Sequence, residues 1–476
     1  MRDIPPATAS QALRLKEQAP RLIDKNLQLN EAQLQQALAA ARQQLLASGA
    51  KAGMRLVLID HNSLSQLLYL LAAWQLRVIA VNLLPRLPAA ELARRAQHCQ
   101  AQMIFDPHAL LDANDCPRLP PLTWPLPSAE HEPCPIWPDE QALLDLSFTS
   151  GSSGQPRAIA HSATNHQASA AASVPLLKLN AHSRYLLSLS LAHIGGLAII
   201  ARWLVSGCTL VLPDAALTLP AQVKRDQISH LSLVAAQLPP LLAEPPAEPL
   251  QILLGGGPVA PALLQDARQR GWHCLMSYGL TEMTALVSAG EVGSGQLLAG
   301  RELRINTEGE IELRGATLAA GIWQHGELHP LTDSSGWYRS GDLGQLDAEG
   351  NVQISGRRDS RFISGGEHIQ PEQIELLLSN LPSVQRALVV AIDHPRWGQR
   401  PAALICGQLP PPAELSAWLS AQLARYQWPD LWLAWPLADN SGKPDRRYWQ
   451  QWAKQQAQHL AATTPSLVLL QPHKES

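Results

Sequence analysis

The chain has 476 residues, of which 46% are hydrophobic and 16% charged, an ordinary globular composition that excludes an intrinsically disordered protein. Its 37 basic and 40 acidic residues leave a formal charge of -3 without a dense basic stripe, so we expect no nucleic-acid partner. The length exceeds what a single hydrophobic core supports, so we expect at least two domains.

The six cysteines lie far apart, with no C-x-x-C pair and no Cys/His cluster at zinc spacing, which favours reduced thiols in the cytoplasm. The N-terminal segment MRDIPPATASQALRLKEQ has charges and prolines where an export signal would be apolar. No charged residue occurs between Arg184 and Arg202, but this stretch is short for a membrane span and is interrupted by polar residues and a Gly-Gly pair. We therefore expect a cytoplasmic protein without a transmembrane segment, and a homo-oligomer is compatible with the sequence.

Helical and strand patterns alternate through the first third of the chain. Residues 31–49 have helical periodicity, residues 55–59 form a short buried-strand pattern, and residues 63–81 resemble a helix followed by a strand. Alternation of this kind is typical of a mostly parallel sheet covered by helices. Recurring prolines between residues 106 and 139 then predict an irregular surface segment.

The pattern changes in the second half. Short alternating segments broken by glycines between residues 301 and 354 predict a small antiparallel sheet. A helix, a strand and an amphipathic stretch beyond Asp359 predict a separate, smaller α+β unit. We expect an α/β protein with an N-terminal domain of layered sheets and helices at 1–356 and a mobile C-terminal domain at 357–476.

The strongest local signal is LSFTSGSSGQPRAIAHS at residues 146–162, where an apolar strand leads into a loop of small residues. Glycines let the backbone approach phosphates, hydroxyl groups donate hydrogen bonds, and the arginine adds positive charge. The spacing is not that of a Walker A loop, and a flexible Ser/Gly linker is the alternative interpretation. The candidate phosphate-binding residues are Thr149, Ser150, Gly151, Ser152, Ser153, Gly154 and Arg157.

The residue order of this loop resembles the nucleotide-binding signature of the adenylate-forming superfamily, which contains acyl-CoA synthetases, luciferases and peptide-synthetase adenylation domains. Further segments resemble the motifs of that superfamily in the same order, namely LSLAHIGGL, SYGLTEMT, WYRSGDLG, ISGRRDSRF, SGGEHIQPEQIE and NSGKPDRR. The resemblance implies a ligase that uses ATP and Mg2+ to convert a carboxylate into an acyl-adenylate. Passage of the acyl group to coenzyme A would follow.

The resemblance also implies roles for individual residues around ATP. Glu282 would hold Mg2+, a hard cation that prefers carboxylate and phosphate oxygens, and Thr281 would hydrogen-bond the α-phosphate. Tyr278 would lie on the adenine beside Gly279, although packing in the core is the alternative for this tyrosine. The LSLAHIGGL motif would place His193 where the acid is bound and activated.

The motifs that follow carry the ribose and domain-movement roles of the family. Asp342 would accept hydrogen bonds from the ribose hydroxyls and Arg357 would approach the same region, although alone Asp342 would be a turn aspartate. Lys443 would reach across the domain interface during adenylation, whereas an isolated lysine of this kind is usually solvated.

Asp359 falls at the hinge about which the family rotates its small domain. Formation of the acyl-adenylate and transfer of the acyl group to coenzyme A would then share one site. After rotation, Gly365 and Gly366 would leave room for the pantetheine arm of CoA, and an ordinary tight turn is the alternative interpretation for these two glycines.

Three segments resemble the o-succinylbenzoate-CoA ligases of menaquinone biosynthesis, namely PRAIAH, RGATLAAGIWQHGEL and SGGEHIQPEQIE. Their acid has two carboxylates, so its pocket is expected to supply a buried cation, and Arg202 is the candidate. An arginine at a helix end more often extends to solvent. Gly255, Gly256 and Gly257 would form the wall between the acyl and adenine pockets.

Other functions stay open at this point. The chain could be another aryl- or acyl-CoA ligase, or an adenylating enzyme that loads a carrier protein. A nucleotide-binding protein without activity is the alternative outside the enzymes.

Overall fold

The computed structural model describes residues 21–112, 116–124, 134–138, 141–149, 156–257, 259–381, 383–435 and 445–463. Five of the predicted phosphate-loop residues and the predicted catalytic lysine lie outside these ranges: Ser150, Gly151, Ser152, Ser153, Gly154 and Lys443.

A nine-stranded sheet has the order β14-β13-β12-β11-β10-β8-β9-β1-β2. Its strands are β1 (Leu22–Asp24), β2 (Leu27–Leu29), β8 (Arg184–Leu186), β9 (Thr209–Val211), β10 (His230–Val234), β11 (Gln251–Gly255), β12 (His273–Leu280), β13 (Ala285–Gly290) and β14 (Gln296–Leu297). The strands from β1 to β12 in this order are parallel, and antiparallel pairs occur only at the two edges.

A seven-stranded sheet has the order β18-β17-β7-β6-β4-β3-β5. Its strands are β3 (Arg55–Ile59), β4 (Ile79–Leu83), β5 (Met103–Phe105), β6 (Leu143–Thr149), β7 (Arg157–Ser162), β17 (Gly321–Gln324) and β18 (Glu327–His329). Strands β6, β4, β3 and β5 are parallel, but β7, β17 and β18 add antiparallel pairs. The parallel sheet predicted for the first third of the chain is therefore confirmed for β3, β4, β5 and β6, and the antiparallel strands are added by later residues.

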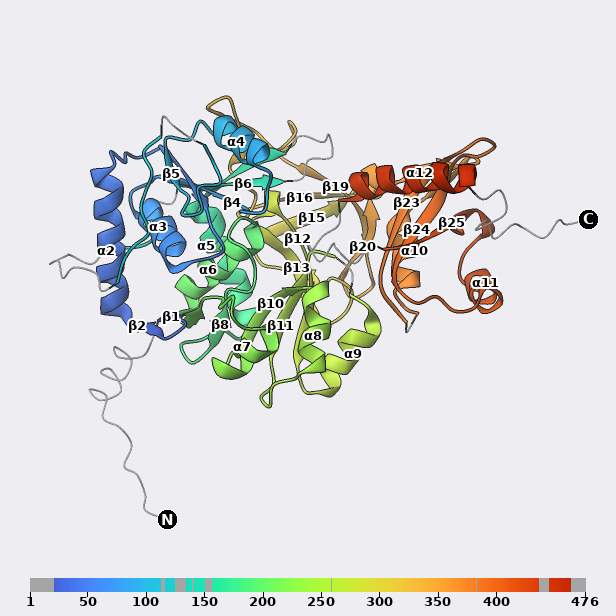
Figure 1. The fold of residues 1–476 in the computed structure, drawn as a ribbon, viewed down its shortest axis with the longest axis horizontal. Helices are drawn as coiled ribbons and strands as arrows, with labels where there is room; N and C mark the ends of the chain where they lie inside the picture. The colour runs from blue at the N-terminus through green and yellow to red at the C-terminus, as the bar shows by residue number, and fades with distance from the viewer. Residues whose placement is uncertain are drawn as a thin grey trace, which may run out of the picture.

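Helices α3 (Leu64–Gln75), α5 (Ala163–Leu176) and α6 (Ile194–Ser206) lie between these two sheets in Figure 1. Helix α2 (Glu31–Ala47) lies at the edge of the molecule and packs against the same apolar core. One apolar cluster joins residues of both sheets with residues of these helices. Helices α3 and α6 are buried over most of their length, which explains why their sequences are apolar on all sides.

The outer faces of the sheets carry shorter helices, namely α4 (Ala89–His98), α7 (Leu219–Arg225), α8 (Leu238–Ala243) and α9 (Pro261–Gln269). Helix α4 packs on the seven-stranded sheet, and the other three pack on the nine-stranded sheet. The uncharged stretch from Arg184 to Arg202 forms β8, a loop and α6, as predicted. Among the described residues, no helix is long and apolar enough to cross a membrane.

A third, fully antiparallel sheet contains β15 (Arg301–Ile305), β16 (Glu310–Gly315), β19 (Tyr338–Leu346) and β20 (Val352–Arg357). It matches the small antiparallel sheet that the alternating segments predicted. A short 3-10 turn, η3 (Arg358–Ser360), follows β20 and leads away from this sheet.

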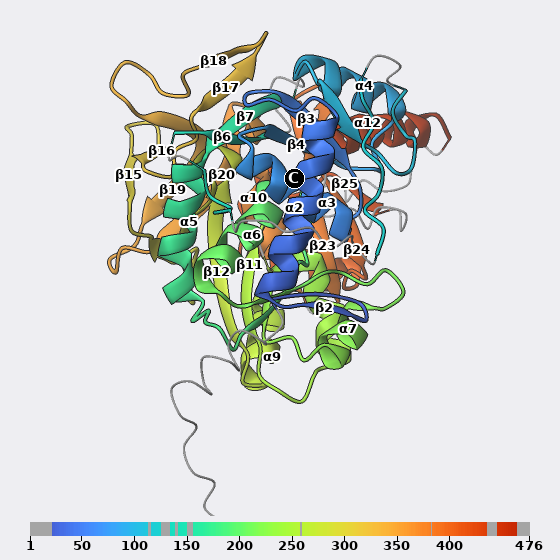
Figure 2. The ribbon, with the colours of Figure 1, turned by 90° about the vertical axis from the view of Figure 1, so that its left-hand side faces the viewer.

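The chain then forms a unit with its own sheet and core, drawn in orange to red in Figure 1. Its strands are β21 (Phe362–Ser364), β22 (Glu367–Ile369), β23 (Val384–His394), β24 (Gly398–Gly407) and β25 (Leu431–Ala434), and its helices are α10 (Pro371–Leu378), α11 (Pro412–Ser420) and α12 (Arg446–Thr463). The sequence pattern did not predict α12. Figure 2 shows the N-terminal side of the molecule, where α2 crosses in front of α3.

Candidate active site

Three glycines expose bare backbone at the carboxyl end of β11, where parallel sheets of this kind bind ligands. A Cβ on Gly255 would lie 2.9 Å from the Oγ of Ser277 on the neighbouring strand, so a side chain does not fit there without a shift. Gly256 has a φ of +79°, and a Cβ on Gly257 would have no heavy atom within 4 Å. This edge can accept a flat group, but its assignment as the wall between two pockets stays a prediction.

The predicted catalytic threonine and glutamate lie in η2 (Thr281–Met283), the tight turn between β12 and β13. A Cβ on Gly279 would lie 1.8 Å from the carbonyl oxygen of Ala285, so only glycine fits at this crossing. Thr284 and Ala285 have φ values of +51° and +78°, which side-chain-bearing residues rarely adopt. The surrounding structure therefore forces this turn into an unusual shape.

The predicted adenine and ribose residues form one chain of hydrogen bonds. The hydroxyl of Tyr278 donates to Oδ2 of Asp342 at 2.7 Å, and Nη1 of Arg357 donates to Oδ1 of the same carboxylate at 3.1 Å. Nε of Arg357 also donates to Asp359 at 3.2 Å, which links the ribose residues to the predicted hinge.

Burial and neighbouring charges shift the pKa values of the side chains in this chain of hydrogen bonds. Burial raises the pKa of Tyr278 well above its ordinary value, and the Asp342 carboxylate raises it further, so the phenol remains a donor. Burial alone would lower the pKa of Arg357, but the carboxylates of Asp342 and Asp359 outweigh it and raise the pKa. The Asp342 carboxylate is thus held between a phenol and a permanent cation.

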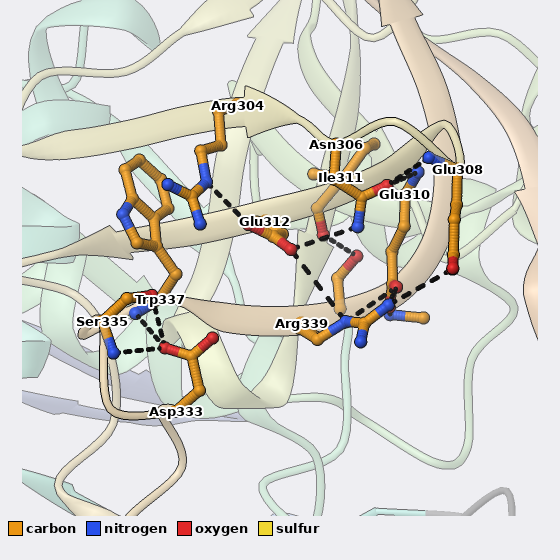
Figure 3. Close-up of polar contacts among 12 residues, drawn as sticks. Arg304, Asn306, Glu308, Glu310, Ile311, Glu312, Asp333, Ser335, Trp337 and Arg339 are labelled. Carbon is orange, nitrogen blue, oxygen red and sulfur yellow. Dashed lines mark hydrogen bonds and ion pairs between the residues drawn. The ribbon is translucent and has the colours of Figure 1, made fainter.

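A layer of ion pairs supports the turn that presents Asp342, as Figure 3 shows around Glu310 and Arg339. Oε1 of Glu310, which is 1% exposed, accepts from the backbone N–H of Gly341 at 3.0 Å. Its other oxygen accepts from Nη2 of Arg339 at 2.5 Å and from Nη1 of Arg358 at 3.2 Å. Glu310 therefore fixes the residue before Asp342 and contacts the first residue of η3.

The arginine of the predicted phosphate loop faces the candidate metal ligand. Nη2 of Arg157, at the start of β7, donates to Oε1 of Glu282 at 2.7 Å. Tyr338 is a neighbour that the sequence did not single out; burial raises the pKa of its phenol, and the adjacent Glu282 carboxylate raises it further. A carboxylate oxygen beside the hairpin of a phosphate loop is a suitable donor for a hard cation, so Mg2+ fits at Glu282.

A buried group of polar residues lies next to this pair and was not predicted as a group. Nδ1 of His161 lies 2.9 Å from Asp145, and its Nε2 lies 2.8 Å from the carbonyl oxygen of Thr281. Nε2 of His166 lies 2.5 Å from the second oxygen of Asp145. The sequence did contain a signal for this group, which was a polar residue inside each of two apolar strands. Asp145 and His161 are cross-strand partners on β6 and β7.

His193 is the N-cap residue of α6, and its side chain is exposed. Surrounding protein atoms nevertheless desolvate the ring, and together with the nearby charges of Arg86 and Arg95 this lowers its pKa. The ring is therefore neutral at neutral pH. The described residues include no hydrogen-bond partner for it, so its predicted catalytic and acid-binding roles stay predictions.

Arg202 does not extend to solvent. It is 2% exposed, and its guanidinium donates to Oγ of Ser173 at 2.9 Å and to the hydroxyl of Tyr185 at 3.1 Å. A second buried arginine, Arg301, lies near enough that burial and the charge of Arg202 lower its pKa to about 10. Neither arginine has a carboxylate partner among the described residues, and Arg301 was missed because nothing in its local sequence marks it.

Arg301 instead donates to backbone and hydroxyl oxygens. Its Nε and Nη1 donate to the carbonyl oxygens of Leu286 and Ala299 at 2.9 and 2.7 Å. Ser169, on the same face of α5 as Ser173, lies 3.5 Å from Nη2 of Arg301. The side chains of Arg202 and Arg301 therefore lie in the same region, between α5, α6 and the strands β13 and β15.

The predicted CoA loop is a two-residue hairpin turn between β21 and β22. Gly365 and Gly366 have φ values of +59° and +92°, so the turn requires residues that adopt positive φ. A Cβ on Gly365 would lie 2.7 Å from the exposed ring of Trp397, which covers the turn. This geometry satisfies the tight-turn interpretation and leaves the CoA role a prediction.

The segment that follows Lys443 is anchored at the start of α12. Nη1 of Arg446 lies 2.6 Å from Glu375, and Nη2 lies 3.2 Å from Glu372, both on α10. Glu372 in turn accepts from the hydroxyl of Ser360 in η3 at 2.6 Å. Arg446, three positions after the predicted catalytic lysine in the sequence, is therefore connected to the predicted hinge.

Comparison with known proteins gives consistent matches. Residues 9–323 match the family model described as AMP-binding enzyme. The 2-succinylbenzoate–CoA ligase of Salmonella typhimurium is 39% identical over 320 residues, which are 66% of this chain and 69% of the relative. The enzyme of the same name from Escherichia coli is 34% identical over 444 residues, which are 90% of this chain and 95% of the relative.

A solved structure matches over almost the same length. The o-succinylbenzoate CoA synthetase (MenE) from Bacillus subtilis, in complex with the acyl-adenylate intermediate OSB-AMP, superposes with a TM-score of 0.79 at 25% identity. The match covers 93% of this chain and 97% of that chain.

Proposed function

The chain belongs to the family of AMP-binding enzymes, and on that basis we propose that it is a 2-succinylbenzoate–CoA ligase of menaquinone biosynthesis. In the first half-reaction a carboxylate oxygen of the acid attacks the α-phosphorus of ATP, and pyrophosphate leaves. In the second, the thiol of coenzyme A attacks the acyl carbon, and AMP leaves. The names of the curated relatives and the acyl-adenylate in the matched structure support this reaction.

The observation that carries the choice of acid is the buried cation Arg202. A buried guanidinium without a carboxylate partner is unfavourable, and the nearby Arg301 adds repulsion. Succinylbenzoate supplies what this region lacks, because only one of its two carboxylates is adenylated and the other stays charged. We therefore assign Arg202 to that remaining carboxylate, with Arg301 as the second source of positive charge.

The nucleotide would be held by the residues around η2 and β19. Tyr278 would cover the adenine, Asp342 and Arg357 would bind the ribose and its phosphate, and Thr281 would donate to the α-phosphate. Bound Mg2+, held by Glu282, would offset the negative charge of the phosphates. Arg157, now paired with Glu282, would also be available to the phosphates.

The second half-reaction would use the unit that follows η3. We place the domain boundary between residues 356 and 357, with Asp359 as the hinge, Gly365 and Gly366 beside the pantetheine arm, and Lys443 acting in adenylation. The connection from Arg446 through Glu372 to Ser360 supports a hinge that is coupled to the lysine segment. Because its substrates are small soluble molecules, we also propose that the enzyme acts in the cytoplasm.

A substrate panel tests the proposal. Purified enzyme with ATP and Mg2+ is given 2-succinylbenzoate, benzoate or octanoate, with either coenzyme A or a holo carrier protein, and AMP release and thioester formation are measured. We expect both products with succinylbenzoate and coenzyme A and little with the two monoacids. AMP release with a monoacid but not with succinylbenzoate would overturn the acid, and transfer only to the carrier protein would overturn the acceptor.

A further inference from the structure

Asp145, His161 and His166 form a cluster that takes no part in the contacts proposed for ATP, the acid or coenzyme A. The three side chains are fully buried, and they come from β6, β7 and the first turn of α5. Each carboxylate oxygen of Asp145 faces one histidine, at 2.9 Å from His161 and 2.5 Å from His166. A charged cluster with no contact to solvent is costly, so its retention calls for a reason.

The contacts of His161 fix where its protons lie. Nδ1 faces a carboxylate, and Nε2 faces the carbonyl oxygen of Thr281 at 2.8 Å. Both partners accept hydrogen bonds, so both ring nitrogens carry a proton and the ring is an imidazolium paired with Asp145. The pKa directions agree, because burial alone would lower the pKa of His161 but the Asp145 carboxylate outweighs it and raises the pKa.

The contacts of the cluster fit a hydrogen-bonded arrangement better than a shared metal ion. Its three ligand-type atoms lie within 4.8 Å of one another, a spacing that metal sites also show. However, both oxygens of Asp145 and both nitrogens of His161 already have hydrogen-bond partners. A protonated ring nitrogen cannot bind a metal ion, so the cluster would have to lose these bonds first.

The position of the cluster suggests its function. Asp145 and His161 are cross-strand partners on the two strands that flank the predicted phosphate loop. The carbonyl that His161 holds belongs to the rigid peptide unit that leads from Thr281 into Glu282. One buried ion pair therefore fastens the hairpin of the phosphate loop to the turn that carries the proposed metal ligand.

We propose that His161 is a positioning residue, which, held by Asp145, fixes the Thr281–Glu282 peptide so that the metal-binding carboxylate faces the phosphate loop. This inference rests on the proposed function, because Glu282 belongs to the site proposed for adenylation. None of the contacts proposed for ATP, the acid or coenzyme A involves Asp145, His161 or His166. The residues act on adenylation through the orientation of Glu282, and no such role is needed for the transfer of an acyl group from a preformed adenylate.

Two amide variants separate positioning from simple packing. In His161→Gln the amide nitrogen occupies the place of Nε2 and still reaches the Thr281 carbonyl. In His161→Asn the shorter amide occupies the place of Nδ1, so it keeps the contact with Asp145 and loses the contact with Thr281. A purely structural role predicts that the asparagine variant is the better of the two, whereas the positioning role predicts the reverse.

A matched control exists in the nine-stranded sheet. His230 is buried, its Nε2 lies 2.9 Å from the carbonyl oxygen of Leu177, and its Nδ1 lies 2.8 Å from Oγ of Ser229. His230→Asn therefore removes the same kind of bond from a buried histidine away from η2. The measurements are the rate of adenylation as a function of Mg2+ concentration, thioester formation from supplied acyl-adenylate and coenzyme A, and the melting temperature.

We expect His161→Asn to slow adenylation by about 10- to 100-fold and to raise the Mg2+ concentration for half-maximal rate about 10-fold, as the loss of supporting contacts does at metal sites. Thioester formation from supplied adenylate should change by less than about 3-fold, and His161→Gln should recover most of the adenylation rate. His230→Asn should leave both half-reactions within about 2-fold. These limits of about 2- and 3-fold are small compared with the loss of rate that a misplaced catalytic group causes.

Several results would overturn the inference. Equal damage to both half-reactions, a better asparagine than glutamine variant, or an unchanged Mg2+ dependence would each show that His161 does not position Glu282. Failure of both variants to fold would make the cluster a folding requirement and exclude the positioning role. One equivalent of tightly bound zinc that is lost in His161→Asn would identify a metal site instead.

The wild-type enzyme keeps this test separate from the proposed function. If the wild type adenylates an acid other than succinylbenzoate, the proposed function fails and the same comparison is made with that acid. If the wild type adenylates succinylbenzoate and His161→Asn behaves as the wild type, only the positioning inference fails.

Discussion

Arg157 and Glu282, 125 positions apart in the chain, form an ion pair in which Nη2 of the arginine lies 2.7 Å from Oε1 of the glutamate. The glutamate side chain is 8% exposed and the arginine side chain 41% exposed, so the pair lies at the border between the core and an accessible site. The predicted phosphate-binding cation and the predicted metal ligand are thereby held face to face. Bound nucleotide and Mg2+ would give each of them a new partner of opposite charge.

Glu282→Gln tests this arrangement, because it keeps the shape of the side chain and removes its charge. We expect adenylation to fall by about 100-fold or more, equivalent to about 3 kcal/mol, since a carboxylate ligand of the cation is lost. Pyrophosphate release at increasing Mg2+ concentration measures the effect. Glu302→Gln is the matched control, because Glu302 also pairs with an arginine, at 2.6 Å, but on an exposed face. Adenylation that stays normal at low Mg2+ would remove Glu282 from the metal site.

Arg202→Met tests the acid pocket. Because the variant loses the cation for the second carboxylate, we expect kcat/KM for succinylbenzoate to fall by about 100-fold, within the range for removing one partner of a buried charge pair. Activity with a monoacid should fall far less. The melting temperature without substrate should drop by only a few degrees, since replacing a buried cation by an apolar side chain is often tolerated.

The control for Arg202→Met is Arg184→Met. Arg184 lies on β8 beside Tyr185 and donates to the carbonyl oxygen of Asp226 at 2.7 Å, away from Arg301. The Arg184→Met variant should leave the ratio of activity with succinylbenzoate to activity with a monoacid unchanged. A parallel loss for both classes of acid in Arg202→Met would mean that this arginine supports the fold and not the choice of substrate.

Lys443→Ala tests the use of one site for two half-reactions. A movable point charge at the reacting carboxylate and α-phosphate matters only while the adenylate forms. We expect adenylation to be nearly abolished, and thioester formation from supplied adenylate to stay largely intact. Lys454→Ala is the control, because Lys454 lies on α12 and pairs with Asp393 at 2.9 Å. Equal loss in both half-reactions would contradict a domain that rotates between them.

The parts of the fold that follow local rules could be predicted from the sequence. The helix at Glu31–Ala47 begins at an Asn30 capping box and was expected over 31–49, and the strand at Arg55–Ile59 was expected over the same residues. The missed helix α12 does carry apolar residues at helical spacing, because Trp449, Trp452, Ala453 and Ala457 recur at i, i+3 and i+4 and pack in one cluster. That signal was overlooked among the glutamines and charged residues of the segment. The helix is held by side-chain contacts to α10 and β23, which local pattern does not reveal.

The site was predicted as separate residues and not as contacts. Motif order placed Tyr278, Asp342 and Arg357 in one region, but their hydrogen bonds depend on how β12 packs against the sheet of β19 and β20. The pairing of Asp145 with His161 follows from hairpin register and was within reach of the sequence. Arg301 was not, because its approach to Arg202 depends on the packing of α5, α6, β13 and β15.

Two of the buried histidines, His161 and His230, should respond to pH in opposite directions. The raised pKa of His161 means that the folded state binds a proton more tightly than the unfolded state, whose histidine pKa is about 6.5. Its contribution to stability is complete below about pH 6.5 and is lost as the pH rises through the folded-state value. Burial lowers the pKa of His230, so the folded state favours the neutral ring, and stability rises as the pH increases towards about 6.5.

Urea unfolding of the wild type, His161→Gln and His230→Asn between about pH 5.5 and 9 measures both slopes, because histidine is the side chain that titrates over this range. We expect the stability difference between wild type and His161→Gln to shrink as the pH rises. The difference for His230→Asn should instead grow from low pH to about pH 6.5 and then stay level. Parallel pH curves for the wild type and His161→Gln would mean that His161 is neutral in the folded protein. In that case one ring nitrogen would face an acceptor without a proton, and the hydrogen bond to Thr281 or to Asp145 would have to be given up.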